Sequence, residues 1–159
     1  MTLNETVLRK LSEWQPAGAG RHVLAASSAG WTVSVTADRC DGMGCLVWEL
    51  SLTRKTTPAG DAGLPSWAEG VAKRVKSLAE SLKVIEVDKV RNEALLRSQD
   101  PSRRGEHVLY FEILLRGTQS ATLRRYQAQH AAGSHRQQVG FALTHEALAK
   151  LAEDVAADQ

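Results

Sequence analysis

Two segments in the first third of the chain alternate hydrophobic with polar residues. An alternation with a period of two predicts a β-strand that has one face against the core and the other in solvent. In the segments 31–37 and 46–53, the positions assigned to the core face are Trp31, Val33, Val35, Ala37, Leu46, Trp48, Leu50 and Leu52. The stretch 41–44 between them, Asp-Gly-Met-Gly, is typical of a turn because glycine adopts positive φ without strain. The two segments are therefore predicted to form a β-hairpin.

Strand patterns continue in the second half of the chain. Residues 83–98 favour two strands, or one long irregular strand, since hydrophobic and acidic residues alternate in the first half of this segment. Three more strands, at 108–115, 120–129 and 137–143, are separated by turn sequences, which predicts an antiparallel meander. In the first and last of these strands, the positions expected to face the core are Leu109, Phe111, Ile113, Leu115, Val139, Phe141 and Leu143.

Three segments show the spacing of an amphipathic helix. The first, at the N-terminus, begins with the T-x-x-E spacing of a capping box at Thr2 and Glu5. The second is a long central helix that begins at another capping box, Ser66 and Glu69. The third follows Thr144, which is suited to cap a helix that closes the chain. The hydrophobic stripes of the second and third helices are Trp67, Val71, Val75, Leu78, Leu82, Leu148, Leu151 and Val155.

These elements predict that residues 1–159 form a single α+β domain. Short connections favour antiparallel pairing, so we expect one mainly antiparallel sheet with helices packed on one face, a helix at each terminus and one long central helix. The order of elements is similar to that of the type III secretion chaperones, small dimeric proteins that hold segments of partner proteins. This resemblance is one of element order, involves no sequence motif, and concerns proteins that are usually acidic. As a fold-level analogy it implies a chaperone-like homodimer that binds other proteins.

The composition agrees with a folded domain. Hydrophobic residues make up 43% of the chain and charged residues 24%, which is unlike a disordered protein. The 20 basic and 18 acidic residues leave a net charge of +2, so the whole-chain charge gives no signal for nucleic-acid binding. The first residues lack the pattern of a secretory signal, and no stretch of about 18 apolar residues occurs. We therefore expect a cytoplasmic protein without membrane association.

The two cysteines flank the predicted hairpin turn. Cys40 and Cys45 are spaced C-x4-C, and His130 and His135 are spaced H-x4-H in another predicted turn, so the four would fit a structural zinc site if the turns meet. A disulfide is a second alternative, because a four-residue turn places Cys40 directly opposite Cys45. A redox role is disfavoured, since the pair is not C-x-x-C and does not begin a helix. The favoured interpretation has the cysteines packed as small hydrophobic residues, with no metal and no cofactor.

No catalytic motif is complete. His145 begins the stretch His-Glu-Ala-Leu-Ala, which is similar to the start of the zinc-binding motif H-E-x-x-H, but Ala149 occupies the position of the second histidine. The sequence also lacks a phosphate-binding loop and the turn that presents a hydrolase serine. We therefore favour a protein that is not an enzyme.

The strongest local charge lies in residues 91–136. This segment has four acids and no lysine, and its eight arginines are Arg91, Arg97, Arg103, Arg104, Arg116, Arg124, Arg125 and Arg136. Arginine is suited to bidentate recognition of carboxylates and phosphates. On the strand at 120–129, Arg124 and Tyr126 share a face opposite to Arg125. The candidate binding residues are Arg116, Arg124, Arg125 and Tyr126, and the alternative is an ordinary charged outer face.

Three functional hypotheses remain. The favoured one is a non-enzymatic protein-binding or chaperone-like module that self-associates and uses an open, arginine-bearing sheet face for a protein partner. A nucleic-acid-binding domain that uses the same face is the second and is not favoured. The third is a metalloprotein or enzyme built around Cys40, Cys45, His130 and His135.

Overall fold

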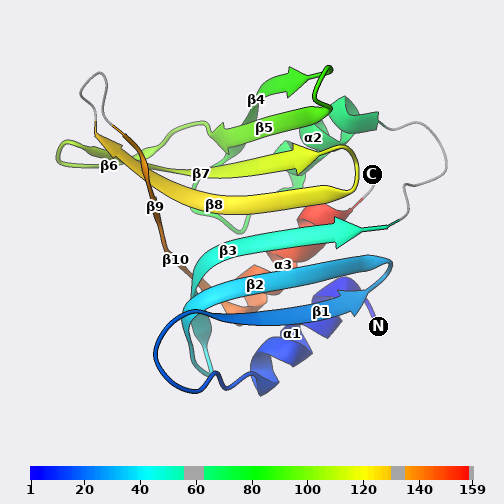
Figure 1. The fold of residues 1–159 in the computed structure, drawn as a ribbon, viewed down its shortest axis with the longest axis vertical. Coiled ribbons are helices and arrows are strands. Elements are labelled where there is room, and N and C mark those ends of the chain that lie inside the picture. The colour runs from blue at the N-terminus through cyan, green and yellow to red at the C-terminus, as the bar shows by residue number, and fades with distance from the viewer. Residues whose placement is uncertain (56–62, 130–134, 158–159) are drawn as a thin grey trace.

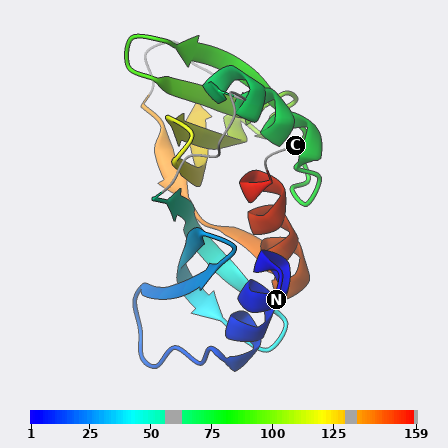
Figure 2. The same ribbon diagram turned by 90° about the vertical axis from the view of Figure 1, so that its right-hand side faces the viewer.

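One antiparallel sheet with helices on one of its faces forms the fold (Figures 1 and 2). The computed structural model describes residues 1–55, 63–129 and 135–157. Within these ranges the helices are α1 (Leu3–Glu13), α2 (Gly63–Arg74) and α3 (His145–Ala156). The strands are β1 (His22–Ser28), β2 (Trp31–Cys40), β3 (Gly44–Arg54), β4 (Leu82–Asp88), β5 (Glu93–Ser98), β6 (Ser102–Arg104), β7 (His107–Arg116), β8 (Ser120–Gln129), β9 (Gln137–Val139) and β10 (Phe141–Thr144). The predicted α+β class is confirmed.

The strands follow the order β1-β2-β3-β8-β7-β5-β4, and each of these neighbours is antiparallel. β4 and β5 form a hairpin, which confirms the prediction of two strands within residues 83–98. The core-face positions predicted for β2 and β7 are buried: Trp31, Val33, Val35, Ala37, Leu109, Phe111, Ile113 and Leu115. Figure 2 shows α1, α2 and α3 on the same side of the sheet, so no helix of the described residues covers its other face.

β3 and β8 separate toward one end, and the segment that leads to α3 lies between them. β3 and β8 pair only where residues 50–53 meet residues 120–123. Beyond this point β9 pairs with β8 and β10 pairs with β3, so the single strand predicted at 137–143 changes partner at Gly140 (Figure 1). A Cβ atom on Gly140 would lie 3.3 Å from the carbonyl oxygen of Val47, which makes glycine the residue that fits this crossing.

A β-bulge at Trp48 interrupts the hydrophobic pattern of β3. Adjacent residues of β2 lie opposite Val47 and Glu49, so Trp48 is an extra residue between them. An extra residue shifts the alternation of side chains by one position. Val47 is consequently buried and Leu46 is 37% exposed. The prediction that Leu46 and Trp48 point into the core is therefore wrong, whereas the inward positions beyond the bulge are confirmed.

The prediction of one long central helix is also wrong. α2 ends at Arg74 instead of continuing to Leu82, which is the first residue of β4. It also begins at Gly63, so the predicted cap Ser66 lies inside the helix. Val75 and Leu78, which belong to the predicted hydrophobic stripe, are buried in an irregular connection.

Tertiary contacts explain why α2 stops. The guanidinium of Arg74 donates hydrogen bonds to the carbonyl oxygens of Asp154 (2.9 Å) and Ala157 (2.6 Å), which fixes the end of α2 to the end of α3. The chain then turns back toward the sheet, where Glu80 forms an ion pair with Arg125. The residues after Arg74 have the spacing of a helix, but the preference of a sequence for helix is weak. These contacts and the pairing of β4 with β5 therefore outweigh it.

The two terminal helices confirm both predicted caps. The Thr2 hydroxyl accepts the backbone N–H of Glu5, whose carboxylate accepts the backbone N–H of Thr2. The Thr144 hydroxyl accepts the backbone N–H of Ala147 at the start of α3. α1 and α3 pack against each other beneath the sheet (Figure 2). Among the helices of the described residues, none has the length and apolar character needed to cross a membrane.

Replacement of Gly44 by alanine is expected to destabilise the fold. Gly44 is paired with Thr144, and a Cβ atom on Gly44 would lie 2.5 Å from the carbonyl oxygen of Leu143. β10 would have to move away from β3, so Gly44→Ala should lower the free energy of unfolding by about 1–3 kcal/mol in urea denaturation. Gly42→Ala is the control, since a Cβ atom there meets nothing within 4 Å. It should change stability by less than about 0.5 kcal/mol, and equal losses in both variants would contradict this account.

Candidate functional site

The face of the sheet without helices, which we call the open face, carries a row of alternating charges. Arg97 of β5 lies opposite Glu112 of β7, and Glu112 lies opposite Arg124 of β8. Glu49 of β3 extends the row through an ion pair with Arg124. Each of these residues is next in sequence to a buried core residue, so its side chain points away from the helices. We call Arg97, Glu112, Arg124 and Glu49 the charged row.

Ion pairs hold this row together. Glu112 Oε2 accepts hydrogen bonds from Arg97 (2.9 Å) and Arg136 (2.7 Å), and the Glu112 side chain is only 10% exposed. Arg124 lies 2.7 Å from Glu49 Oε1. Burial lowers the pKa of Arg136, but hydrogen bonds to Tyr110 and Glu112 outweigh it and raise the pKa overall. Arg136 therefore stays charged, and carboxylates hold it, Arg97 and Arg124 in place.

An aromatic pair lies beside the charged row. Tyr110 and Tyr126 face each other across β7 and β8, with ring centroids 5.9 Å apart. The guanidinium of Arg136 lies 3.8 Å from the ring centroid of Tyr126, and that of Arg97 lies 5.3 Å from the ring centroid of Tyr110. Both distances are within the range of cation–π attraction. Arginine and tyrosine thus form one connected surface, the aromatic–arginine cluster of Tyr110, Tyr126, Arg97 and Arg136.

Three of the predicted binding residues lie on the open face. Arg124 belongs to the charged row and Tyr126 to the aromatic–arginine cluster. Arg116 lies opposite Glu93 at one end of the same face, and its side chain is 67% exposed and paired with Glu93 at 3.1 Å. The structure therefore brings Arg124 and Tyr126 together and leaves Arg116 at the periphery.

The fourth predicted binding residue, Arg125, lies on the other face of the sheet. Its guanidinium is 4.4 Å from the ring centroid of Phe111, a core residue, and forms an ion pair with Glu80 at 3.1 Å. Only 16% of its side chain is exposed. Arg125 therefore contributes to the connection between the sheet and the segment after α2, and not to the open face.

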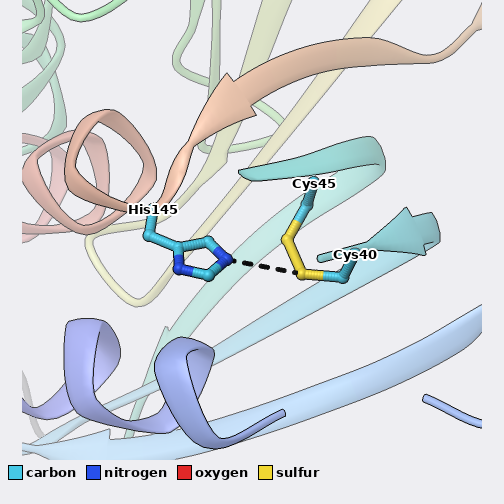
Figure 3. Close-up of side chains that lie close together, drawn as sticks. All are labelled: Cys40, Cys45 and His145. Carbon is cyan, nitrogen blue, oxygen red and sulfur yellow. Dashed lines mark hydrogen bonds between the residues drawn. A yellow bond between two sulfur atoms is a disulfide. The ribbon is translucent and has the colours of Figure 1, made fainter. Parts of the chain in front are cut away.

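A disulfide joins the two strands of the first hairpin at its turn, so the favoured interpretation of Cys40 and Cys45 as two packed thiols is wrong. Cys40 and Cys45 are direct partners across β2 and β3, as a four-residue turn requires, and Figure 3 shows the bond between their sulfur atoms. His145, the first residue of α3, points at this disulfide, with its Nε2 atom 3.8 Å from Cys40 Sγ. The backbone N–H of His145 donates to the carbonyl oxygen of Met43 in the turn (3.1 Å). The turn and the start of α3 are therefore fastened together.

The structure groups a set of potential metal ligands that differs from the zinc alternative considered from the sequence. Within the described ranges, the grouping of potential metal ligands is Cys40, Cys45 and His145. His135 is not part of it and lines a separate pocket beside His107. His130 lies outside the described residues. The sequence signal for His145 was its place at the start of a stretch similar to H-E-x-x-H, but no pattern in the sequence linked it to the cysteines.

A pocket of about 810 Å³ adjoins the disulfide. Both cysteines line it, together with residues of the loop before β1, of β1 and of β10, such as Pro16, His22 and Thr144. Asp41 lies at its rim, where hydrogen bonds from the backbone N–H groups of Met43 and Gly44 lower the pKa of its carboxyl group. The Asp41 carboxylate thereby stabilises the turn that separates the cysteines.

Comparisons with known proteins give no functional information. No family model matches the chain, and no curated protein or solved structure matches it. Its function is therefore inferred from the side chains of the open face and of the disulfide site.

Replacement of Glu112 by glutamine is expected to weaken the open face. Glu112 is the shared partner of Arg97 and Arg136, whose side chains are 39% and 41% exposed. Because solvent screens these arginines in part, Glu112→Gln should cost about 1–3 kcal/mol of unfolding free energy in urea. The control is Glu93→Gln, which removes the partner of the more exposed Arg116 and should cost less than about 1 kcal/mol. A loss as small as that of Glu93→Gln would contradict the structural role of Glu112.

Proposed function

We propose that this chain is a non-enzymatic protein-binding module with a chaperone-like role, which holds a segment of a partner protein on its open face. The observation that carries this proposal is the aromatic–arginine cluster on the face that the helices leave uncovered. Tyrosine and arginine are among the residues in which the binding energy of protein interfaces is concentrated. Their association across neighbouring strands gives the open face the composition of a protein interface.

The cluster is arranged before any partner binds. Arg136 is held by the carboxylate of Glu112 and by the ring of Tyr126. Arg97 is held by the same carboxylate and by the ring of Tyr110. A surface that is already ordered loses less conformational entropy on binding. This order supports recognition by a rigid platform.

The charge of the open face favours a protein over a nucleic acid. Four of its arginines (Arg97, Arg116, Arg124 and Arg136) are each paired with one of three glutamates (Glu49, Glu93 and Glu112), so these seven side chains together carry a net charge of +1. Nucleic-acid binding depends on unneutralised positive charge that contacts phosphates. These ion pairs therefore support a partner that is bound through short-range contacts more than through long-range electrostatic attraction.

Self-association is part of the same proposal. In the described part of the sheet, β1 and β4 lie at the two ends of the main strand order, and each pairs with a single neighbour. The backbone groups of an edge strand can pair with a strand of a second copy. Ile85 on β4 is 44% exposed and Val23 on β1 is 63% exposed, so both edges present apolar side chains to a second molecule.

Photo-crosslinking from the open face tests this proposal. A photoreactive amino acid replaces Thr122, which lies on the open face beside the charged row, or Lys73, which is exposed on α2. In cells that produce the protein, the Thr122 position should yield products with another protein or with a second copy of the chain. The additional substitution Arg136→Ala should lower that yield about tenfold, as expected for loss of a residue that contributes about 1.4 kcal/mol to binding.

The controls define what would contradict the proposal. Arg9→Ala removes an exposed arginine from α1 and should leave the yield unchanged. Equal yields from Thr122 and Lys73 would overturn the assignment of the open face. Products with nucleic acid, formed with a steep dependence on salt, would favour the alternative of a nucleic-acid-binding domain.

A further inference from the structure

Three side chains of the metal-ligating kind converge at the end of the first hairpin. The Sγ atoms of Cys40 and Cys45 and the Nε2 atom of His145 all lie within 4.8 Å of one another (Figure 3). They come from β2, β3 and α3, and His145 is separated from Cys40 by 105 positions in the sequence. The fold, and not local sequence, therefore creates this cluster.

The backbone fixes the cluster independently of the disulfide. Cys40 and Cys45 are held opposite each other by the pairing of β2 with β3. The pairing of Thr144 with Gly44 and the hydrogen bond from His145 N–H to the Met43 carbonyl hold the start of α3 against the same turn. Reduction of the disulfide removes none of these contacts. The three side chains consequently remain neighbours when the cysteines are thiols.

Among the residues that the structure describes, the partner of the His145 ring nitrogen Nε2 is a weak one while the disulfide is intact. His145 is only 4% exposed, and its Nε2 atom faces Cys40 Sγ at 3.8 Å. Sulfur is a weak hydrogen-bond acceptor, and a buried polar group is costly unless it is well paired. A metal ion held between the ring nitrogen and the two sulfurs would supply that pairing.

We propose that, in the reduced protein, Cys40, Cys45 and His145 bind one Zn²⁺ ion. Two thiolates and an imidazole are a preferred ligand set of zinc. With Zn–S distances of about 2.3 Å and Zn–N distances of about 2.0–2.1 Å, a sulfur and a nitrogen on one tetrahedral ion lie about 3.6 Å apart. The distance of 3.8 Å between Cys40 Sγ and His145 Nε2 fits this geometry. The two sulfurs reach their positions by rotation of the cysteine side chains after the S–S bond is broken.

Zinc can bind at this site only after the Cys40–Cys45 disulfide is reduced. A dithiol reductant gives two electrons and two protons to the Cys40–Cys45 bond, becomes a disulfide itself and leaves two thiols on the chain. Zn²⁺ then displaces the two thiol protons to form two zinc–thiolate bonds. In the oxidised chain both sulfurs are consumed by the disulfide, so the oxidised protein cannot form this site.

A fourth ligand could reach the ion from the pocket beside the two cysteines. Both cysteines line the pocket of about 810 Å³, which has room for a water molecule on the ion. The nearest carboxylate in the turn, that of Asp41, is engaged by the backbone N–H groups of Met43 and Gly44. Three protein ligands and one open position are the arrangement of zinc sites that exchange a ligand. This site is separate from the aromatic–arginine cluster and does not depend on the proposed function of the open face.

Zinc stoichiometry in the two redox states tests the inference. The protein is reduced with a phosphine, incubated with zinc sulfate, freed of unbound metal by gel filtration and analysed by atomic emission. We expect about one zinc per chain in the reduced protein and none in the oxidised protein. A reduced protein that retains less than about a tenth of an equivalent would overturn the inference.

Variants identify the ligands. Cys45→Ser and His145→Asn should each weaken zinc binding at least about tenfold, whereas His135→Asn, which alters a histidine outside the cluster, should retain it. Equal losses from His145→Asn and His135→Asn would overturn the assignment. Binding of Co²⁺ to the reduced native chain provides a readout that needs no variant. Thiolate-to-cobalt charge-transfer bands with the strong visible absorption of a tetrahedral ion are expected, and a spectrum without thiolate bands would contradict the site.

Discussion

The passage of residues 135–145 from β8 to β3 holds both candidate sites in place. At its start, Arg136 covers Tyr126 on the open face. The chain then pairs with β8, crosses at Gly140, pairs with β3 and ends with His145 against the disulfide. Gly140 and Gly44 permit this close approach, since a Cβ atom on either would press on the backbone of the neighbouring strand. A displacement of residues 135–145 would thus disturb both the aromatic–arginine cluster and the disulfide site.

On the open face, charge is abundant but balanced. Carboxylates lie between arginines across neighbouring strands, as Glu112 does between Arg97 and Arg136, and this fixes long side chains that would otherwise be mobile in solvent. Paired charges contribute more to the specificity of an interface than to its affinity. The partly exposed ring of Tyr110 then provides apolar area for binding, while Tyr126 is buried beneath Arg136 and supports the cluster from below. Order and apolar contact are therefore combined on one face of the sheet.

The disulfide site combines a contact between residues close in sequence with a contact between residues far apart in sequence. Cys40 and Cys45 meet through a short turn, so their proximity follows from the hairpin alone. Strand pairing near the opposite end of the chain brings His145 to the cysteines, and its backbone N–H donates a hydrogen bond to the carbonyl oxygen of Met43. Because the hairpin does not need the disulfide to keep its register, the oxidised and reduced chains can share one backbone arrangement. Whether the site holds a disulfide or can bind a metal ion then depends on the redox state of the two sulfurs.

Local patterns were sufficient for the α+β class, the strand faces of β2 and β7, the caps at Thr2 and Thr144 and the hairpin that places the cysteines opposite each other. These features depend on residues close together in the chain, where period and turn chemistry act directly. The bulge at Trp48 arises from the register of β2 against β3, for which the alternation gave no signal. The end of α2 at Arg74, the change of partner at Gly140 and the approach of His145 to Cys40 arise instead from long-range contacts. Such pairings satisfy backbone and side-chain groups that are far apart in sequence, and a single sequence carries no periodic signal for them.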